Sequence, residues 1–336
     1  MTRALVTGMG GSIGVHVWCH LMHNTDWDVV GLDSLRHMGL SERIVEAAKD
    51  HPQWLTRTTC LTHDLTAPVG EILAQQIGKI DHIINLASLS DVHVSLVDPV
   101  PFFQNNVNVA LNMLEFARRV RPQTFMQISS DEVYGPTDGK HEHREWDPIL
   151  PSSPYSASKA AQEAECIAWW RSYNVPLIIV NVMNNFGEMQ NPRKFPVLVQ
   201  KAIAADKPVT IHGTINSVGT RYYMHSRNAA DAMLFILKHV KPHLHVDGTM
   251  DRPERFNIVG DRCVSNIDLA EMIASYMGKP VRMEFEDFHS ARPGHDRHYG
   301  LDGLKLTRLG WRAPVSFEDS LAEVVRWQQE HPEWIS

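Results

Sequence analysis

A glycine-rich segment near the start of the chain constrains the fold more than any other feature. The apolar run Arg3–Thr7 leads into Gly8-Met9-Gly10-Gly11-Ser12-Ile13-Gly14, and helical apolar spacing follows. A strand that turns tightly on glycines into a helix brings backbone N–H groups and the positive helix end toward a bound pyrophosphate. The segment therefore predicts a dinucleotide-binding loop. The residues expected to contact the cofactor in this loop are Gly8, Gly11, Ser12, Ile13 and Gly14.

Short apolar runs alternate with amphipathic stretches through the first half of the chain. The expected strands are Arg3–Thr7, Asp28–Asp33, Leu55–Cys60, Ile80–Ala87, Thr124–Ser129 and Leu177–Asn181. The expected helices between them are Ser12–His23, Val69–Ile77, Val107–Val120 and Ala157–Ser172. This alternation predicts an α/β fold with a Rossmann-type, doubly wound parallel sheet.

The pattern becomes irregular from about residue 184. Shorter helices are expected at Ser226–His239, Ile267–Met277 and Phe317–Glu330. We expect a Rossmann domain over residues 1–183, with returns near 222–260. A smaller, partly interleaved substrate-binding lobe is expected from residues 184–221 and 261–336.

Composition excludes several classes of protein. The chain has 336 residues, 43% of them hydrophobic, and a net charge of −7, which favours neither nucleic acid nor an anionic membrane as partner. No apolar run approaches the roughly 20 residues of a membrane span. The four cysteines lack CxxC spacing and are expected to be reduced thiols. The opening strand leaves no room for a signal peptide, so a cytoplasmic location is expected.

Histidines are numerous but dispersed. Two pairs, His141/His143 and His243/His245, have the spacing of metal ligands, and both fall in loops rich in proline or charge. We expect no metal site.

Acids at strand ends indicate which dinucleotide is bound. Asp33 ends the second expected strand, where a carboxylate can accept hydrogen bonds from a ribose 2′-hydroxyl and repels a 2′-phosphate. This favours NAD over NADP, although Arg36 lies close by. Asp64 and Leu65 follow the third expected strand and are expected near the adenine, with a solvated turn as the alternative.

Tyr155 and Lys159 stand four residues apart at the start of an expected helix, after Pro151-Ser152-Ser153-Pro154. They therefore share a helix face. A phenol is a poor base at neutral pH, but an ammonium group and a positive nicotinamide stabilise the phenolate. The pair predicts hydride transfer to a nicotinamide, with Tyr155 as base and Lys159 also holding the ribose.

Adjacent carboxyls suggest a second kind of chemistry. Asp131 and Glu132 follow the fifth expected strand, directly after Ser130. Ser130 can hydrogen-bond the oxygen that is oxidised. Elimination of water needs one carboxyl as a base and one as an acid, and burial of adjacent groups separates their pKa values. A strand-end cap is the alternative reading of this pair.

Together these motifs resemble the extended short-chain dehydrogenase/reductase family, and within it the nucleotide-sugar 4,6-dehydratase group typified by the dTDP-glucose enzymes. The resemblance runs nearly end to end. The segments that carry it are residues 7–14, 128–135 (Ile-Ser-Ser-Asp-Glu-Val-Tyr-Gly), 151–161 (Pro-Ser-Ser-Pro-Tyr-Ser-Ala-Ser-Lys-Ala-Ala), 184–187 (Asn-Asn-Phe-Gly) and 292–299 (Arg-Pro-Gly-His-Asp-Arg-His-Tyr).

The resemblance implies a lyase with tightly bound NAD. Tyr155 would take the proton from the sugar O4 while the C4 hydride passes to NAD. Glu132 would remove the C5 proton, Asp131 would protonate the departing C6 hydroxyl, and the hydride would return to C6. Further cofactor contacts implied by position are Leu86, Ala87, Ser88 and Asn106. Residues placed on the substrate, several of them on its diphosphate, are Asn185, His212, Arg221, Arg292 and Tyr299.

Other segments depart from the dTDP-glucose pattern. Residues 87–95 and 191–196 differ from the usual sequences, and His212 replaces a tyrosine expected beneath the base. The reaction class is therefore better specified than the nucleotide-diphosphate sugar, and thymidine, uridine, cytidine and guanosine forms all stay open.

Three other functions remain open. A nucleotide-sugar 4-epimerase needs Tyr155 and Lys159 but neither Asp131 nor Glu132. A nucleotide-uronate decarboxylase usually carries the Glu of the pair alone, and a non-catalytic NAD-binding scaffold predicts loss of Tyr155 or Lys159. The resemblance also implies a homodimer that pairs the Val107–Val120 and Tyr155–Ser172 helices in a four-helix bundle.

Overall fold

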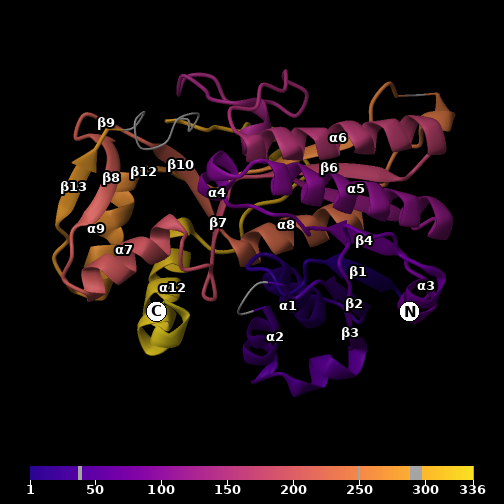
Figure 1. Cartoon of the computed structure of the whole chain (residues 1–336), viewed down its shortest axis with the longest axis horizontal. Helices are drawn as coiled ribbons and strands as arrows, with labels where there is room; N and C mark the ends of the chain where they lie inside the picture. The colour runs from indigo at the N-terminus through magenta and orange to yellow at the C-terminus, as the bar shows by residue number, and fades with distance from the viewer. Residues whose placement is uncertain (37–39, 249, 288–296, 336) are drawn as a thin grey trace.

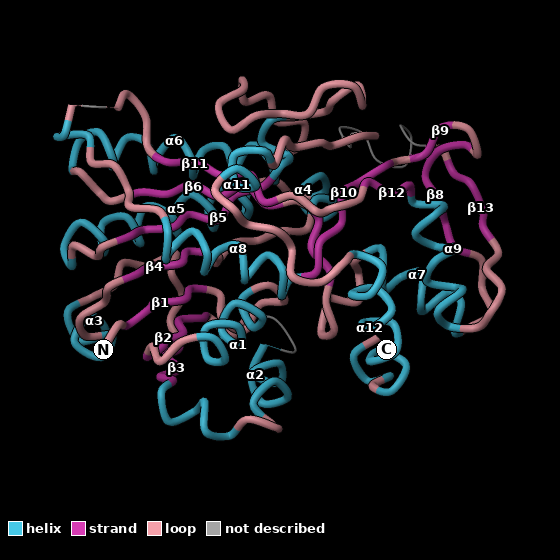
Figure 2. Tube along the Cα trace, turned by 180° about the vertical axis from the view of Figure 1, so that it is seen from behind, coloured by secondary structure: helices cyan, strands magenta, loops and turns pink. Residues whose placement is uncertain are grey.

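The computed structural model describes residues 1–36, 40–248, 250–287 and 297–335. Its main feature is a seven-stranded sheet with the strand order β11-β6-β5-β4-β1-β2-β3 (Figure 2), in which neighbouring strands run parallel. Its strands are β1 (Arg3–Thr7), β2 (Asp28–Asp33), β3 (Thr58–Thr62), β4 (His82–Asn85), β5 (Thr124–Ser130), β6 (Leu177–Val182) and β11 (Glu254–Ile258).

Helices cover both faces of this sheet (Figure 1, and from behind in Figure 2). Ala4 and Val6 of β1 pack with α1 and α8, whereas Leu5 between them packs with α5 and α6. Alternate side chains of one strand thus enter two separate cores, as expected for a parallel sheet buried on both sides. The helices of this part are α1 (Gly14–Asn24), α2 (Leu40–Ala48), α3 (Glu71–Ile77), α4 (Val92–Val97), α5 (Val100–Val120), α6 (Pro154–Tyr173), α8 (Ser226–His239) and α11 (Leu304–Arg308).

The remaining elements build a second, smaller core. Two three-stranded sheets have the orders β12-β10-β7 and β13-β8-β9, and they pack with three further helices. The residues of this core all lie between Phe186 and Val325. The elements are β7 (Asn184–Phe186), α7 (Phe195–Ala204), β8 (Val209–Thr214), β9 (Ser217–Val218), β10 (Thr220–His225), β12 (Cys263–Ser265), α9 (Asn266–Met277), β13 (Met283–Glu286) and α12 (Phe317–Glu330). Short 3-10 helices are η1 (Pro52–Arg57), η2 (Asp131–Tyr134), η3 (His245–Asp247) and η4 (Pro332–Trp334).

The predicted Rossmann-type fold is confirmed, with corrections to individual elements. The expected strand Leu55–Cys60 is wrong in its first half, because Pro52–Arg57 forms the 3-10 turn η1 and β3 begins at Thr58. The helix expected from Val107 begins at Val100. Strand β11 was not among the expected strands. In the described ranges, no helix is both long and apolar enough to cross a membrane.

Candidate active site

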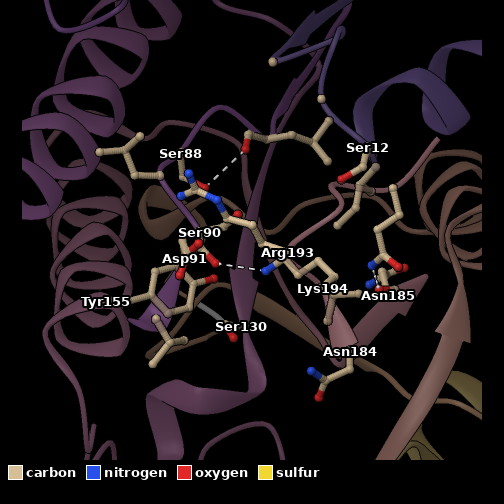
Figure 3. Close-up of a pocket in the computed structure, with 18 of the residues that line it drawn as sticks. Ser12, Ser88, Ser90, Asp91, Ser130, Tyr155, Asn184, Asn185, Arg193 and Lys194 are labelled. Carbon is tan, nitrogen blue, oxygen red and sulfur yellow. Dashed lines mark hydrogen bonds between the residues drawn. The ribbon is translucent and has the colours of Figure 1, made fainter. Parts of the chain in front are cut away.

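The predicted site residues converge on a cavity of about 630 Å³ at the carboxyl ends of the parallel strands (Figure 3). Its walls come from the glycine loop, the ends of β2, β4 and β5, the start of α6, and the segments β7, β8 and β10. A crevice at this edge is where open α/β sheets bind ligands. The predicted residues that line it are Gly8, Gly11, Ser12, Ile13, Gly14, Asp33, Asp64, Leu65, Leu86, Ala87, Ser88, Ser130, Asp131, Glu132, Tyr155, Lys159, Asn185, His212 and Arg221.

The glycine loop has the geometry needed to hold a dinucleotide. Gly8 has φ +67°, and a Cβ on Gly14 would stand 2.0 Å from the Gly8 carbonyl oxygen. A Cβ on Gly11 would meet no atom within 4 Å other than that oxygen, at 3.0 Å, so Gly11 presents bare backbone to the cavity. The start of α1 faces the same space. These residues fit the pyrophosphate of a dinucleotide cofactor.

The end of β2 presents Asp33 to the cavity. Its carboxylate accepts hydrogen bonds from the N–H groups of Gly10 at 3.0 Å and Leu35 at 3.0 Å. The nearby Arg36 pairs with Asp64 across 3.2 Å and donates to Asn105 Oδ1 at 2.7 Å. Asp33 therefore keeps its carboxylate beside the glycine loop, while Arg36 is engaged by groups on other segments.

Tyr155 and Lys159 lie buried in the first turns of α6. Ser153 caps this helix by accepting a hydrogen bond from the Ser156 N–H, so Tyr155 is held close to the helix start. Lys159 Nζ donates to the Ile128 carbonyl across 2.8 Å, and burial lowers the pKa of Lys159 to about 8. Burial, followed by the charges of Glu132 and Asp131, raises the pKa of Tyr155 above its ordinary value.

Ser130, Asp131 and Glu132 occupy the end of β5 and the first turn of η2. Ser130 Oγ donates to Asp131 Oδ1 at 3.0 Å and accepts the N–H of Glu132 at 3.3 Å. Asp131 is 4% exposed, and burial raises its pKa to about 6 although the Ser130 hydrogen bond and the charge of Arg221 oppose the shift. A buried carboxyl with such a pKa is protonated in a larger share of molecules near neutral pH than an ordinary aspartate.

The predicted substrate residues divide into three groups. Asn185, on β7, and His212, on β8, line the cavity, and His212 Nδ1 lies 3.7 Å from Glu286 Oε2. Arg221 lines it from β10, and its guanidinium lies 4.5 Å from the ring centroid of Tyr299, which is buried and not in the cavity wall. Arg292 lies outside the described residues.

Asn106 supports the wall of the cavity rather than lining it. Its amide accepts the N–H of Leu89 at 2.8 Å, donates to the Leu89 carbonyl at 3.1 Å and donates to Ser158 Oγ at 2.8 Å. Leu89 is a lining residue, and Ser158 sits on α6 beside Lys159. Asn106 thereby joins the loop after β4 to α6.

Sequence reasoning missed a contact that crosses the cavity. Lys194 Nζ donates to the Ser90 carbonyl across 3.1 Å, and Figure 3 shows this bond between two lining segments distant in sequence. Arg193 and Gln190 also line the cavity. The departures of residues 87–95 and 191–196 from the dTDP-glucose pattern were the signals in the sequence that pointed to this wall.

The chain matches a family model described as GDP-mannose 4,6 dehydratase over residues 5–324. It is 32% identical over 355 residues to dTDP-glucose 4,6-dehydratase of Neisseria meningitidis, covering 99% of this chain and 95% of that protein. It is 31% identical over 350 residues to a probable dTDP-glucose 4,6-dehydratase of Sinorhizobium fredii, covering 99% and 94%.

A solved structure has the same architecture. The dTDP-glucose 4,6-dehydratase of Streptomyces venezuelae, crystallised with NAD bound, superimposes with a TM-score of 0.86 at 28% identity. The match covers 99% of this chain and 98% of that one. The chain belongs to the GDP-mannose 4,6 dehydratase family, within the extended short-chain dehydrogenases/reductases.

Proposed function

We propose that this protein is an NAD-dependent nucleotide-sugar 4,6-dehydratase that forms a 4-keto-6-deoxy sugar nucleotide. The observation that carries the proposal is that Asp131 and Glu132 line the same cavity as Tyr155 and the glycine loop. Hydride transfer by itself needs no pair of carboxyls, whereas elimination of water needs an acid and a base. The named relatives and the NAD-bound neighbour support the same reaction class.

The residues take separate proton-transfer roles in this proposal. The glycine loop and Asp33 would hold NAD, which would supply the chemistry of hydride removal from C4 and hydride return to C6. Tyr155 removes the O4 proton, Ser130 hydrogen-bonds that oxygen, and Lys159 holds the ribose and supplies positive charge. Once C4 is a ketone, the C5 proton becomes acidic. Glu132 removes it, and Asp131 donates a proton to the departing C6 hydroxyl.

The pKa shifts of Asp131 and Tyr155 support these separate roles. Asp131 is buried and has its pKa raised to about 6, so it can supply a proton nearer neutral pH than an ordinary aspartate, as the general acid requires. Burial keeps Tyr155 a neutral phenol in the protein alone. Its activation therefore depends on added positive charge, as a nicotinamide ring brings.

The substrate side is built for a diphosphate. Arg221 is 6% exposed at the cavity wall, and two of its hydrogen bonds run to backbone carbonyls of Thr220 and Arg297, which hold the guanidinium in place. Asn185 adds an amide on the neighbouring strand. We assign both to the substrate diphosphate, and His212 to the base pocket. The Asp33 carboxylate favours NAD over NADP, because it repels a 2′-phosphate.

The decisive experiment is turnover with a panel of nucleotide-diphosphate sugars. We expect loss of water by mass spectrometry, no net NADH, and one solvent deuterium at C5. A product inverted at C4 with its C6 hydroxyl intact would make the protein a 4-epimerase, and release of carbon dioxide from a uronate would make it a decarboxylase.

We also propose a cytoplasmic homodimer with two lobes. All four cysteines are free, and the separate core between Phe186 and Val325 supports the proposed division at about residue 184. On α5 and α6, Leu114 belongs to the chain's own core, but Ala164 is exposed and Ile167 is half-buried. An Ala164→Arg variant should be monomeric by light scattering if these helices form the interface.

A further inference from the structure

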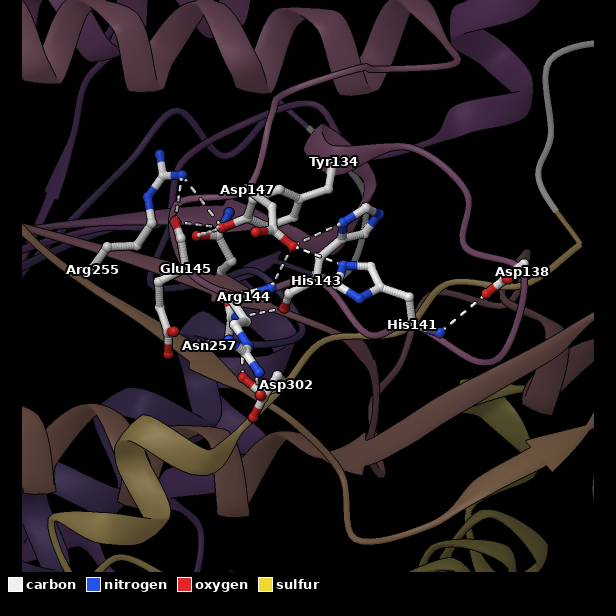
Figure 4. Close-up of polar contacts among 11 residues, drawn as sticks. Tyr134, Asp138, His141, His143, Arg144, Glu145, Asp147, Arg255, Asn257 and Asp302 are labelled. Atoms are coloured by element: carbon white, nitrogen blue, oxygen red, sulfur yellow. Dashed lines mark hydrogen bonds and ion pairs between the residues drawn. The ribbon is translucent and has the colours of Figure 1, made fainter.

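Two histidines and a carboxylate meet outside the catalytic cavity. Residues 141–147 lie in the connection between η2, which carries Glu132, and α6, which carries Tyr155. His141 Nε2 lies 3.0 Å from Asp147 Oδ2, and His143 Nδ1 lies 3.6 Å from the same oxygen. Figure 4 shows the Asp147 carboxylate facing both imidazole rings. The three donor atoms all lie within 4.8 Å of one another.

The fold holds this cluster in place through its backbone. The N–H of His143 donates to the Gly300 carbonyl at 2.9 Å, and the His143 carbonyl accepts the N–H of Asp302 at 2.9 Å. The His143 ring stacks on Tyr134 at 5.2 Å between centroids. Asp147 Oδ2 accepts the N–H of Arg144 at 3.0 Å. Two of the three donors are therefore positioned before any ligand arrives.

The ring nitrogens of His143 are available as ligands. Both are buried, and neither makes a hydrogen bond to any residue in the described ranges. Buried polar atoms normally have a partner, so this ring is unusual. With no hydrogen bond fixing its tautomer, Nδ1 can present its lone pair toward Asp147 without breaking a contact.

The separations also suit zinc. Zn–N and Zn–O bonds of about 2.0–2.2 Å in a tetrahedron put neighbouring ligand atoms about 3.3–3.5 Å apart. The two N···O separations, 3.0 and 3.6 Å, lie on either side of that value. His141 is largely exposed, which leaves room for water as the fourth ligand.

A second cluster with the same composition behaves differently. His16, Glu188 and His225 also bring three donors together. However, His225 Nδ1 accepts the N–H of Arg227 at 2.9 Å, so its proton sits on Nε2, which faces Glu188 Oε1 at 3.2 Å. A metal on Nε2 would force the proton onto Nδ1, against the Arg227 N–H. In that cluster Glu188, which follows β7, pairs with His16 of α1 and with His225, the N-cap of α8.

We propose that His141, His143 and Asp147 form a binding site for a Zn²⁺-class divalent ion with two nitrogen ligands and one oxygen ligand. The ion would hold in place the connection between η2, which carries Glu132, and α6, which carries Tyr155. The proposal is independent of the proposed reaction, because none of the three side chains lines the catalytic cavity.

The test is calorimetric titration of Zn²⁺ into the full chain loaded with NAD, with Co²⁺ absorption as a second probe of tetrahedral coordination. We expect one ion per chain. His143→Ala and Asp147→Asn should each weaken binding by more than about tenfold, since even outer-sphere changes at metal sites cost that much. Asp147→Asn is the gentler variant, because its amide oxygen can still accept the Arg144 N–H.

The matched control is His23→Ala, which removes an exposed histidine at the end of α1 and should leave binding unchanged. Retained NAD binding in every variant shows that the chain still folds. The proposal would be overturned by absence of saturable binding, or by binding to His143→Ala or Asp147→Asn that is as tight as to the unmodified chain. Loss of binding in His16→Gln would also overturn it.

Discussion

Ser130 Oγ donates a hydrogen bond to Asp131 Oδ1 across 3.0 Å and accepts the N–H of Glu132 at 3.3 Å. One hydroxyl thus orients both residues of the carboxyl pair. Donation to Asp131 stabilises its charged form and opposes the effect of burial on its pKa. The hydroxyl proposed to contact the sugar O4 therefore also tunes the acid proposed to act at C6.

Removing that hydroxyl should shift the pH dependence of elimination. An acid must be protonated, so the rate falls as pH rises through the pKa of Asp131, about 6 in the protein. Ser130→Ala removes a contact that lowers this pKa, so the pKa rises and the alkaline limb moves to higher pH. Single-turnover rates measured across pH check this. If the alkaline limb of the pH–rate profile is unchanged in Ser130→Ala, Ser130 does not control the pKa of Asp131.

Neutral replacements of the pair should uncouple oxidation from elimination. Asp131→Asn and Glu132→Gln keep the side-chain shapes, and each should slow water loss by about 10²–10⁴-fold, the usual size of general acid–base catalysis. Hydride transfer needs neither carboxyl, so NADH should accumulate in stopped-flow absorbance. Asp138→Asn, an exposed acid on the following loop, is the control. Normal product formation by both variants would make the pair structural.

Loss of the Tyr155 hydroxyl should suppress the first step and everything after it. Tyr155→Phe keeps the ring packing at the start of α6 but removes the proposed base, and we expect a loss of about 10²–10⁴-fold in hydride transfer. NAD should stay bound, and the amount of NAD released on denaturing the variant checks this. Tyr173→Phe, at the exposed end of the same helix, should behave as wild type.

Alanine substitutions at Gly14 and Gly11 should have different effects on stability and on NAD binding. A Cβ on Gly14 would lie 2.0 Å from the Gly8 oxygen, so Gly14→Ala must shift the backbone and should lower the free energy of unfolding by about 1–3 kcal/mol. A Cβ on Gly11 would meet only the Gly8 carbonyl oxygen, at 3.0 Å, and Gly11 lines the cavity, so Gly11→Ala should cost less stability and mainly weaken NAD binding. Urea unfolding and NAD titration on both variants distinguish the effects, and similar profiles for the two would contradict the assignment.

The buried ion pair of Arg255 and Glu163 should be a large contributor to stability. The two side chains are 1% and 0% exposed, and Glu163 also accepts Asn181 Nδ2 at 2.8 Å. Arg255→Met leaves a buried charge uncompensated and should cost about 3–5 kcal/mol in urea unfolding. Adding Glu163→Gln should restore part of the loss.

The exposed pair of Arg262 and Glu318 supplies the comparison for that measurement. Arg262→Met should cost less than about 1 kcal/mol, because water screens exposed charges. Equal costs for the two arginine variants would show that burial does not control the strength of these pairs.

Sequence patterns failed where tertiary contacts outweigh local preference. Strand β11 contains Arg255 and Asn257, both fully buried, so its apolar pattern is broken by residues whose partners lie far along the chain. Helix α5 begins at Val100, earlier than the expected Val107, and Pro101 stands in its first turn, a position where proline fits a helix. Pro52 begins η1, whose last three residues, Leu55–Arg57, were expected to start a strand.

The sequence by itself determined the parallel sheet, the glycine loop, Asp33, the carboxyl pair and the Tyr155–Lys159 pair. Each depends on residues close together in the chain and on the rule that strand ends meet at one edge. Tertiary structure alone decided that Lys194 reaches the same cavity, and that His143 meets Asp147 with neither ring nitrogen hydrogen-bonded to a residue of the described ranges. Those outcomes depend on packing between distant segments, which no local pattern encodes.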